Sequence, residues 1–155
     1  MPEERVEYVP FNSLDAYEND DKAYNLDPPD NRTVNVPLLR KMLEHITAHP
    51  EEWDQDTWAS ESETSTCGTS FCLAGHVVNS LGHPLVWREN LDHTAYCLAD
   101  GQLRTIESVA IHALGIDNHD ADCLFAASNS LYDLWNTARD ITNGEIDIPD
   151  EVRGR

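Results

Sequence analysis

The sequence predicts an α+β fold that is mainly α, in a compact single domain of about five helices with one small β-hairpin. Three observations predict it. The segment from Cys67 to Val86 contains no Asp, Glu, Lys or Arg, which is typical of a buried element. Amphipathic segments with helix-capping residues lie on both sides of it, and Asp100-Gly101 is a hairpin turn between two apolar runs. The 155 residues, 40% of them apolar, suit one domain with a hydrophobic core.

Acidic residues, Asn and the Pro28-Pro29 pair dominate residues 1–33, which we expect to form an extended or mobile acidic arm. The globular domain is expected to span residues 34–144. Its first helix begins after Asn35, an N-cap residue, with Pro37 near the first helical position, and ends at His49-Pro50. The apolar residues of this helix recur with a helical period: Leu38, Leu39, Met42, Leu43 and Ile46.

An acidic connector follows, since residues 51–66 carry six acidic residues and no basic one. We expect a short turn of helix in it and a loop from Ser60 to Thr66. Thr69 or Ser70 is expected to cap the next helix, which runs to about Leu81. Because the residues of this helix are apolar nearly all round, it should lie at the centre of the domain.

The β-hairpin is expected to pair residues 94–99 with residues 102–106. Three further helices are expected at residues 106–114, stopped by Gly115, at about 118–127 after an Asp117 cap, and at 130–143, stopped by Gly144. A capping box with Asp133 in place of Glu opens the last of them. Residues 145–155 are expected to form a polar C-terminal tail.

The segment C-G-T-x-x-C-x-A-G, with L-G-I-D, L-F and N-S-x-x-D-L further along the chain, resembles a group of short uncharacterised proteins of actinobacteria and their tailed phages. The resemblance covers roughly residues 35–143 and implies a phage or mobile-element origin. An aromatic residue usually follows A-G in that group, whereas this chain has His76. The matching residues are Cys67, Gly68, Thr69, Cys72, Ala74, Gly75, Leu114 to Asp117, Leu124, Phe125, Asn129, Ser130, Asp133 and Leu134.

The charge of the chain is strongly negative, because 10 basic residues face 29 acidic ones and the net charge is −19. Such a field repels nucleic acid phosphates, so direct DNA or RNA binding is not expected. The acidity has three interpretations. The surface docks on a basic protein partner, it imitates DNA and inhibits a nucleic-acid-binding protein, or it only keeps the protein soluble.

The favoured function is that of a small acidic binding protein that docks on a host or phage protein with a basic surface, without a cofactor. No apolar run approaches the roughly 20 residues of a membrane span, and the N-terminus lacks an apolar signal core, so we expect a cytoplasmic protein without membrane contact. The aromatic residues of the acidic connector are candidate anchors. The candidate docking residues are Glu51, Glu52, Trp53, Asp54, Asp56 and Trp58.

The alternative is a zinc-binding protein or a thiol-dependent enzyme. Cysteine and histidine residues at several positions offer enough ligands for a tetrahedral zinc site, although their spacing is unusual for zinc modules. Cys72 near a helix N-terminus, one turn from His76, can also be drawn as a thiolate and imidazole pair, but no oxyanion hole is recognisable and no catalytic residue is assigned. Packed thiols are favoured over both. The alternative ligand set is Cys67, Cys72, His76, His93 and Cys97.

Overall fold

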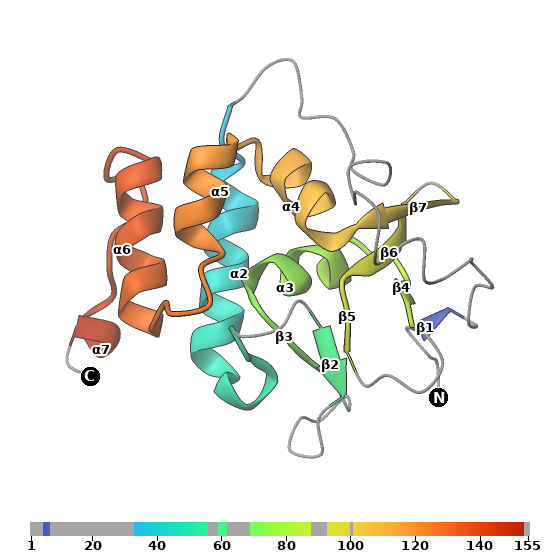
Figure 1. Ribbon diagram of the computed structural model, residues 1–155. Coiled ribbons are helices and arrows are strands. Elements are labelled where there is room, and N and C mark those ends of the chain that lie inside the picture. Colours follow the sequence, from blue (N-terminus) through green and yellow to red (C-terminus); the bar gives the residue numbers. More distant parts are fainter. Residues whose placement is uncertain are drawn as a thin grey trace.

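The computed structural model describes residues 5–6, 33–55, 59–61, 69–87, 93–99 and 101–153, and it confirms a mainly helical α+β fold (Figure 1). The helices of the described part are α2 (Val36–Ala48), the 3₁₀-helix η2 (Pro50–Glu52), α3 (Leu73–Ser80), α4 (Ile106–Leu114), α5 (Asn118–Leu124), α6 (Leu131–Ile141) and α7 (Asp150–Arg153). The strands are β1 (Arg5–Val6), β2 (Ala59–Glu61), β3 (Thr69–Phe71), β4 (Leu85–Val86), β5 (His93–Thr94), β6 (Tyr96–Ala99) and β7 (Gln102–Thr105).

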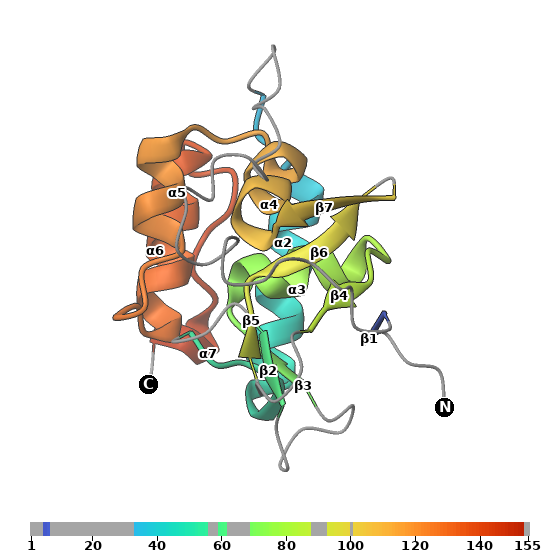
Figure 2. The same ribbon diagram turned by 45° about the vertical axis from the view of Figure 1, so that its right-hand side comes forward.

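Helix α3 lies at the centre of the arrangement and packs against both α2 and α4. Helices α6 and α7 lie at one side of the molecule with α5 beside them, strands β1, β4, β6 and β7 lie at the other side, and β2, β3 and β5 lie below α3 (Figure 1). The turned view in Figure 2 keeps α5, α6 and α7 apart from β1, β4, β6 and β7 and again shows β2, β3 and β5 below α3. The core therefore runs from the α5–α6 pair through α2 and α3 to the inner side of the strands.

The first helix of the domain forms as the sequence predicts. The Asn35 side chain accepts a hydrogen bond from the Leu38 amide at 3.2 Å, so it caps α2, and Pro37 occupies the first turn. His49 follows as the C-cap. The buried face of α2 consists of Leu39, Met42, Leu43, Ile46 and Thr47.

Helix α3 is buried from Leu73 to Val78, which confirms its central place, but its predicted cap is wrong. The cap is Cys72, whose Sγ accepts a hydrogen bond from the Gly75 amide at 3.5 Å. Thr69 and Ser70 belong instead to β3, which pairs antiparallel with β2. Their backbone is extended because it serves this pairing, so the helix begins two or three residues later than expected.

The hairpin of β6 and β7 forms around the predicted turn and belongs to a four-stranded sheet in the order β1-β4-β6-β7. The other sheet, in the order β3-β2-β5, was not predicted, and β2 occupies the start of the expected loop at Ser60. The strand expected over residues 94–99 is divided at Ala95. His93–Thr94 joins the second sheet, whereas Tyr96–Ala99 stays in the hairpin.

Helices α5 and α6 begin at their predicted N-caps. Asp117 accepts from the Asp120 amide, and Ser130 forms a capping box with Asp133. Helix α5 ends at Leu124, earlier than expected, because side chains capture its last carbonyl groups. The Asn129 amide donates to the carbonyls of Cys123 and Leu124 at 2.8 and 3.0 Å.

Gly115 ends α4 in the left-handed region, with φ of +69°. A Cβ atom at this position would lie 2.1 Å from the Thr33 carbonyl oxygen, so only glycine fits. The Asn35 amide also donates to the Leu114 carbonyl at 2.8 Å. The entry to α2 therefore lies directly on the end of α4. Of the predicted arm, only Thr33 and the pair Arg5–Val6, which aligns parallel with β4, lie within the described residues.

The C-terminal segment corrects the expectation of a polar tail over residues 145–155. Ile146, Ile148 and Val152 are fully buried and belong to the hydrophobic core. The Arg40 guanidinium donates to the Glu145 carbonyl at 2.8 Å, and α7 packs on α6. In this irregular segment apolar residues alternate with acidic ones, and the apolar side is buried. The high proportion of polar residues therefore suggested a tail, although one side of the segment packs on the core. The globular unit therefore continues to at least Arg153.

Burial of this segment makes its contribution to stability measurable. Ile148→Ala is expected to lower the free energy of unfolding by about 2–4 kcal/mol in chemical denaturation, because it removes buried methyl groups and leaves a cavity. Glu145→Gln, at an exposed neighbouring position, serves as the control and should change it by less than about 0.5 kcal/mol. Equal, small effects of both substitutions would mean that the segment does not pack on the core.

Candidate functional site

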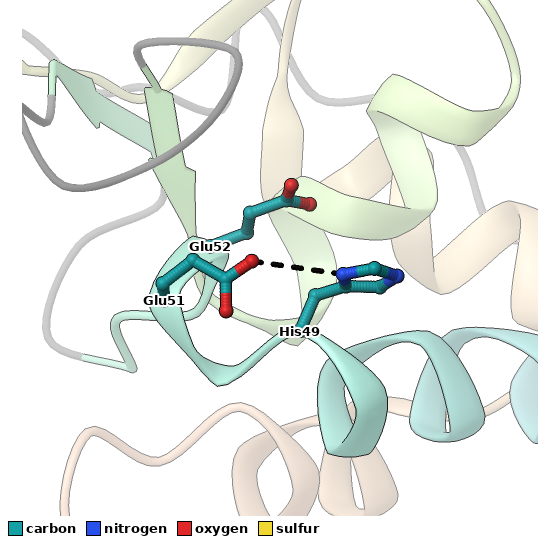
Figure 3. A group of neighbouring side chains, drawn as sticks. All are labelled: His49, Glu51 and Glu52. Atoms are coloured by element: carbon teal, nitrogen blue, oxygen red, sulfur yellow. Dashed lines mark ion pairs between the residues drawn. The ribbon is translucent and has the colours of Figure 1, made fainter.

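The end of α2 and the 3₁₀-helix η2 bring two histidines and two glutamates together. Pro50 starts η2 directly after the His49 cap and turns the chain back over the last turn of α2. The His45 Nε2 atom then lies 2.9 Å from Glu52 Oε1, and His49 Nδ1 lies 3.6 Å from Glu51 Oε2. Figure 3 shows both carboxylates on the side of the His49 ring.

A third histidine extends this group into the core. The His45 ring lies between those of His49 and His76, with ring centroids 4.7 and 5.3 Å away. His76 comes from α3, and its Nε2–H donates to the Glu52 carbonyl at 2.8 Å. Glu52 therefore binds one histidine through its side chain and another through its backbone, and this links η2 to both helices.

His76 is neutral in the folded protein. Burial lowers its pKa from 6.5 to about 4, and the hydrogen bond to the Glu52 carbonyl only partly opposes this effect. The side chain is 4% exposed and also contacts the Phe71 ring, with centroids 4.9 Å apart. Because its Nε2 atom carries the donated hydrogen, His76 has a structural role here and is not a general base at that atom.

The predicted docking residues are only partly free to meet a partner. Glu51 and Glu52 face histidines of the same chain. Trp53 is half-buried, packs against the core and donates its Nε1–H to Gln55 Oε1 at 2.8 Å. Asp54 is partly buried, and its amide donates to the Phe71 carbonyl. The other two predicted residues, Asp56 and Trp58, lie outside the described residues.

The predicted zinc ligands do not converge where the structure describes them. Cys67 and the His93 side chain lie outside the described residues, and Cys72, His76 and Cys97 do not form a group of ligand atoms. Among the described residues one such group exists, in which single ligand atoms of His49, Glu51 and Glu52 all lie within 4.8 Å of one another (Figure 3).

The pKa of Cys72 argues against a reactive thiolate at this position. Burial raises the pKa of the Cys72 thiol to about 12, although the backbone amides of the helix start oppose the effect. Burial likewise raises the pKa of Cys97 to about 12. The pKa of Cys72 is raised although the thiol lies at a helix start, because desolvation of the thiolate outweighs the favourable backbone amides.

A second feature lies between α2, α6 and the C-terminal segment. It is a cavity of about 290 Å³ whose lining residues are Glu44, Thr47, Ala48, Trp135, Pro149 and Glu151. Trp135 is 3% exposed and donates its Nε1–H to Thr47 Oγ1 at 3.0 Å. Glu44 and Glu151 are exposed. We call this feature the α2–α7 pocket.

Neither the histidine–glutamate cluster at η2 nor the α2–α7 pocket was predicted from the sequence. His49-Pro50 was interpreted only as the end of a helix, although the run His45-x-x-x-His49-Pro50-Glu51-Glu52 indicates that these histidines and glutamates lie close together. Two histidines four residues apart share a helix face, and a proline-started turn returns the following acids to that face. The α2–α7 pocket had no comparable signal, because its walls are far apart in the chain.

Comparison of the chain with protein-family models, curated proteins and solved structures gave no match. None of the helices in the described part of the chain has the length and apolar character that a membrane crossing requires.

The low pKa of His76 predicts acid sensitivity. Below pH 6.5 the unfolded chain binds a proton at this imidazole, whereas the folded chain stays neutral until about pH 4, so stability is lost as the pH falls through this window. Between pH 7 and pH 5 this loss amounts to about 2 kcal/mol of unfolding free energy.

Urea denaturation of wild type and His76→Gln at the two pH values measures the effect. The Gln amide can still donate to the Glu52 carbonyl but takes up no proton, so the variant should lose about 2 kcal/mol less than wild type over this range. An equal loss in both proteins would show that His76 is not the group responsible.

Proposed function

We propose that this protein is a small acidic binding protein that docks on a basic region of another protein and receives a Lys or Arg side chain in the α2–α7 pocket. The observation that carries the proposal is the pocket itself. Two exposed carboxylates, Glu44 and Glu151, flank it, and Trp135 and Thr47 belong to its lining.

The size and chemistry of the pocket support a single basic side chain. Its volume of about 290 Å³ lies at the small end of ligand pockets, which occupy about 300–1,000 Å³. A guanidinium or ammonium group between two carboxylates gains charge-assisted hydrogen bonds. The aliphatic stem of the same side chain would cover Ala48 and Pro149, which matches how Lys and Arg bury their stems.

The charge of the whole chain supports the same class of partner. A net charge of −19 attracts basic surfaces over long range and accelerates their association. The neighbourhood of the pocket contributes to this field, because all six acidic residues of α6 and of residues 145–153 are exposed. These exposed residues are Asp133, Asp140, Glu145, Asp147, Asp150 and Glu151.

The C-G-T-x-x-C-x-A-G resemblance supports a phage or mobile-element origin, and we therefore propose that the partner is a host or phage protein inside the host cell. The acidic connector is the less favoured docking surface, because Glu51 and Glu52 already face histidines. An inhibitor that imitates DNA would use the same acidic field. It is distinguished by its partner, which would bind nucleic acid and be released by added DNA.

Paired charge variants test the pocket. Glu44→Gln with Glu151→Gln removes its carboxylates, and Asp140→Asn with Glu145→Gln removes the same charge at exposed positions that do not line it. A partner captured from host lysate should bind the pocket variant at least about tenfold more weakly, because two charge-assisted contacts are lost. The control pair should change the affinity by less than about threefold, since exposed charges outside the contact act weakly.

The association rate with the wild-type chain should also fall by a factor of roughly 10 to 1000 between low and physiological salt. Equal effects of the two variants would place the contact elsewhere. The acidic connector is then tested with three variants. One neutralises Glu51, Glu52, Asp54 and Asp56 together, and the others are Trp53→Ala and Trp58→Ala.

A further inference from the structure

We propose that His49, Glu51 and Glu52 bind a divalent transition-metal ion of the zinc class, with His45 holding Glu52 in place. This site goes beyond the docking function and shares no residue with the α2–α7 pocket. We call it the η2 metal site.

The spacing of the ligand atoms supports a metal ion between them. His49 Nδ1 and Glu51 Oε2 are 3.6 Å apart, which is too long for a hydrogen bond. Two ligands that each bind zinc at about 2.0–2.2 Å with tetrahedral angles lie about 3.3–3.6 Å apart. The third ligand, the Glu52 carboxylate, completes a set whose members all lie within 4.8 Å. To bind one ion together, the three ligand atoms would move to the separation of about 3.3–3.6 Å that tetrahedral zinc requires.

The surroundings of Glu52 resemble those of a metal-bound carboxylate. Its Oε1 accepts a hydrogen bond from His45 Nε2 at 2.9 Å, which leaves Oε2 for the ion. Carboxylates that bind metals are commonly held in this way by a neighbouring donor. The Glu52 side chain is only 15% exposed, so it loses little conformational freedom when it binds.

The backbone also prepares the site. The amides of Glu52 and Trp53 donate to the carbonyls of His49 and Pro50, at 3.0 and 3.2 Å, and fix the turn that carries the three ligands. The ligands surround the C-terminal end of α2, where the helix dipole places partial negative charge. A cation is favoured there in addition to its direct bonds.

The donor set defines the class of ion. An imidazole with two carboxylates suits zinc and its first-row neighbours, whereas magnesium and calcium prefer sites made of oxygen alone. Three protein ligands leave a coordination position for water or for a group of a bound partner. The side chains of His49 and Glu51 are exposed and that of Glu52 is partly exposed, so the ion can enter from solvent.

The site is tested with the full chain. A chelator first removes any bound metal, and zinc binding is then measured by titration with zinc chloride in an isothermal calorimeter. We expect one ion per chain, and at least about tenfold weaker binding by His49→Ala, Glu51→Gln or Glu52→Gln, each of which removes a ligand. His112→Ala and Glu145→Gln alter exposed residues outside the cluster, and each should change the affinity by less than twofold. Magnesium chloride should not compete.

His45 is a positioning residue, and its test needs a conservative variant. His45→Ala should weaken zinc binding by about 10–100-fold, as for other residues that orient ligands. His45→Gln can still donate to the Glu52 carboxylate and should restore most of the affinity. Thermal melting in excess chelator checks that both variants fold like wild type.

Cobalt binding distinguishes this site from the cysteine alternative. Nitrogen and oxygen ligands give no sulfur-to-cobalt charge-transfer band, and Cys72→Ser with Cys97→Ser should leave the affinity unchanged. The proposal is overturned by absence of zinc binding at 1 mM, by binding that survives all three ligand substitutions, by a charge-transfer band, or by equal competition from magnesium. None of these outcomes affects the test of the α2–α7 pocket, because the Glu44 and Glu151 variants retain all four residues of the metal site.

Discussion

Gln55 holds the connector, the central helix and the α5 end together through one buried side chain. Its Oε1 accepts from Trp53 Nε1 and from the Leu73 amide, and its Nε2 donates to the Leu124 and Ala126 carbonyls. These four bonds use the full capacity of a glutamine amide. A buried partner left without its bond costs about 1–3 kcal/mol. The direction in which the chain leaves η2 therefore depends on this residue.

Side chains in the last turns of α2 point in three directions, and each direction leads to different surroundings. Leu43 and Ile46 enter the core, Glu44 and Thr47 line the α2–α7 pocket, and His45 meets Glu52 of η2. This division follows from the helical period, which separates neighbouring positions by about 100°. One helix thus contributes to two surfaces of different chemistry without sharing a side chain between them.

The features that could be predicted from the sequence are those that depend only on neighbouring residues. The caps at Asn35, Asp117 and Ser130, the stop at Gly115 and the hairpin turn depend on residues within one or two turns, so they could be predicted without a partner. The second sheet, the burial of residues 146–152 and the α2–α7 pocket depend on distant segments. The η2 metal site was the exception that local spacing could have shown, because its four residues lie within eight positions.

The closure of the core by residues 146–152 has a consequence for how the chain folds as it is made. Trp135 bonds Thr47 across 88 residues, and Arg40 bonds the Glu145 carbonyl across 105. During synthesis α2 emerges long before α6 and residues 146–152, so its apolar face waits for partners that are made later. The native core can therefore be completed only after residues 146–152 have been made, and until then part of the apolar surface of α2 stays uncovered.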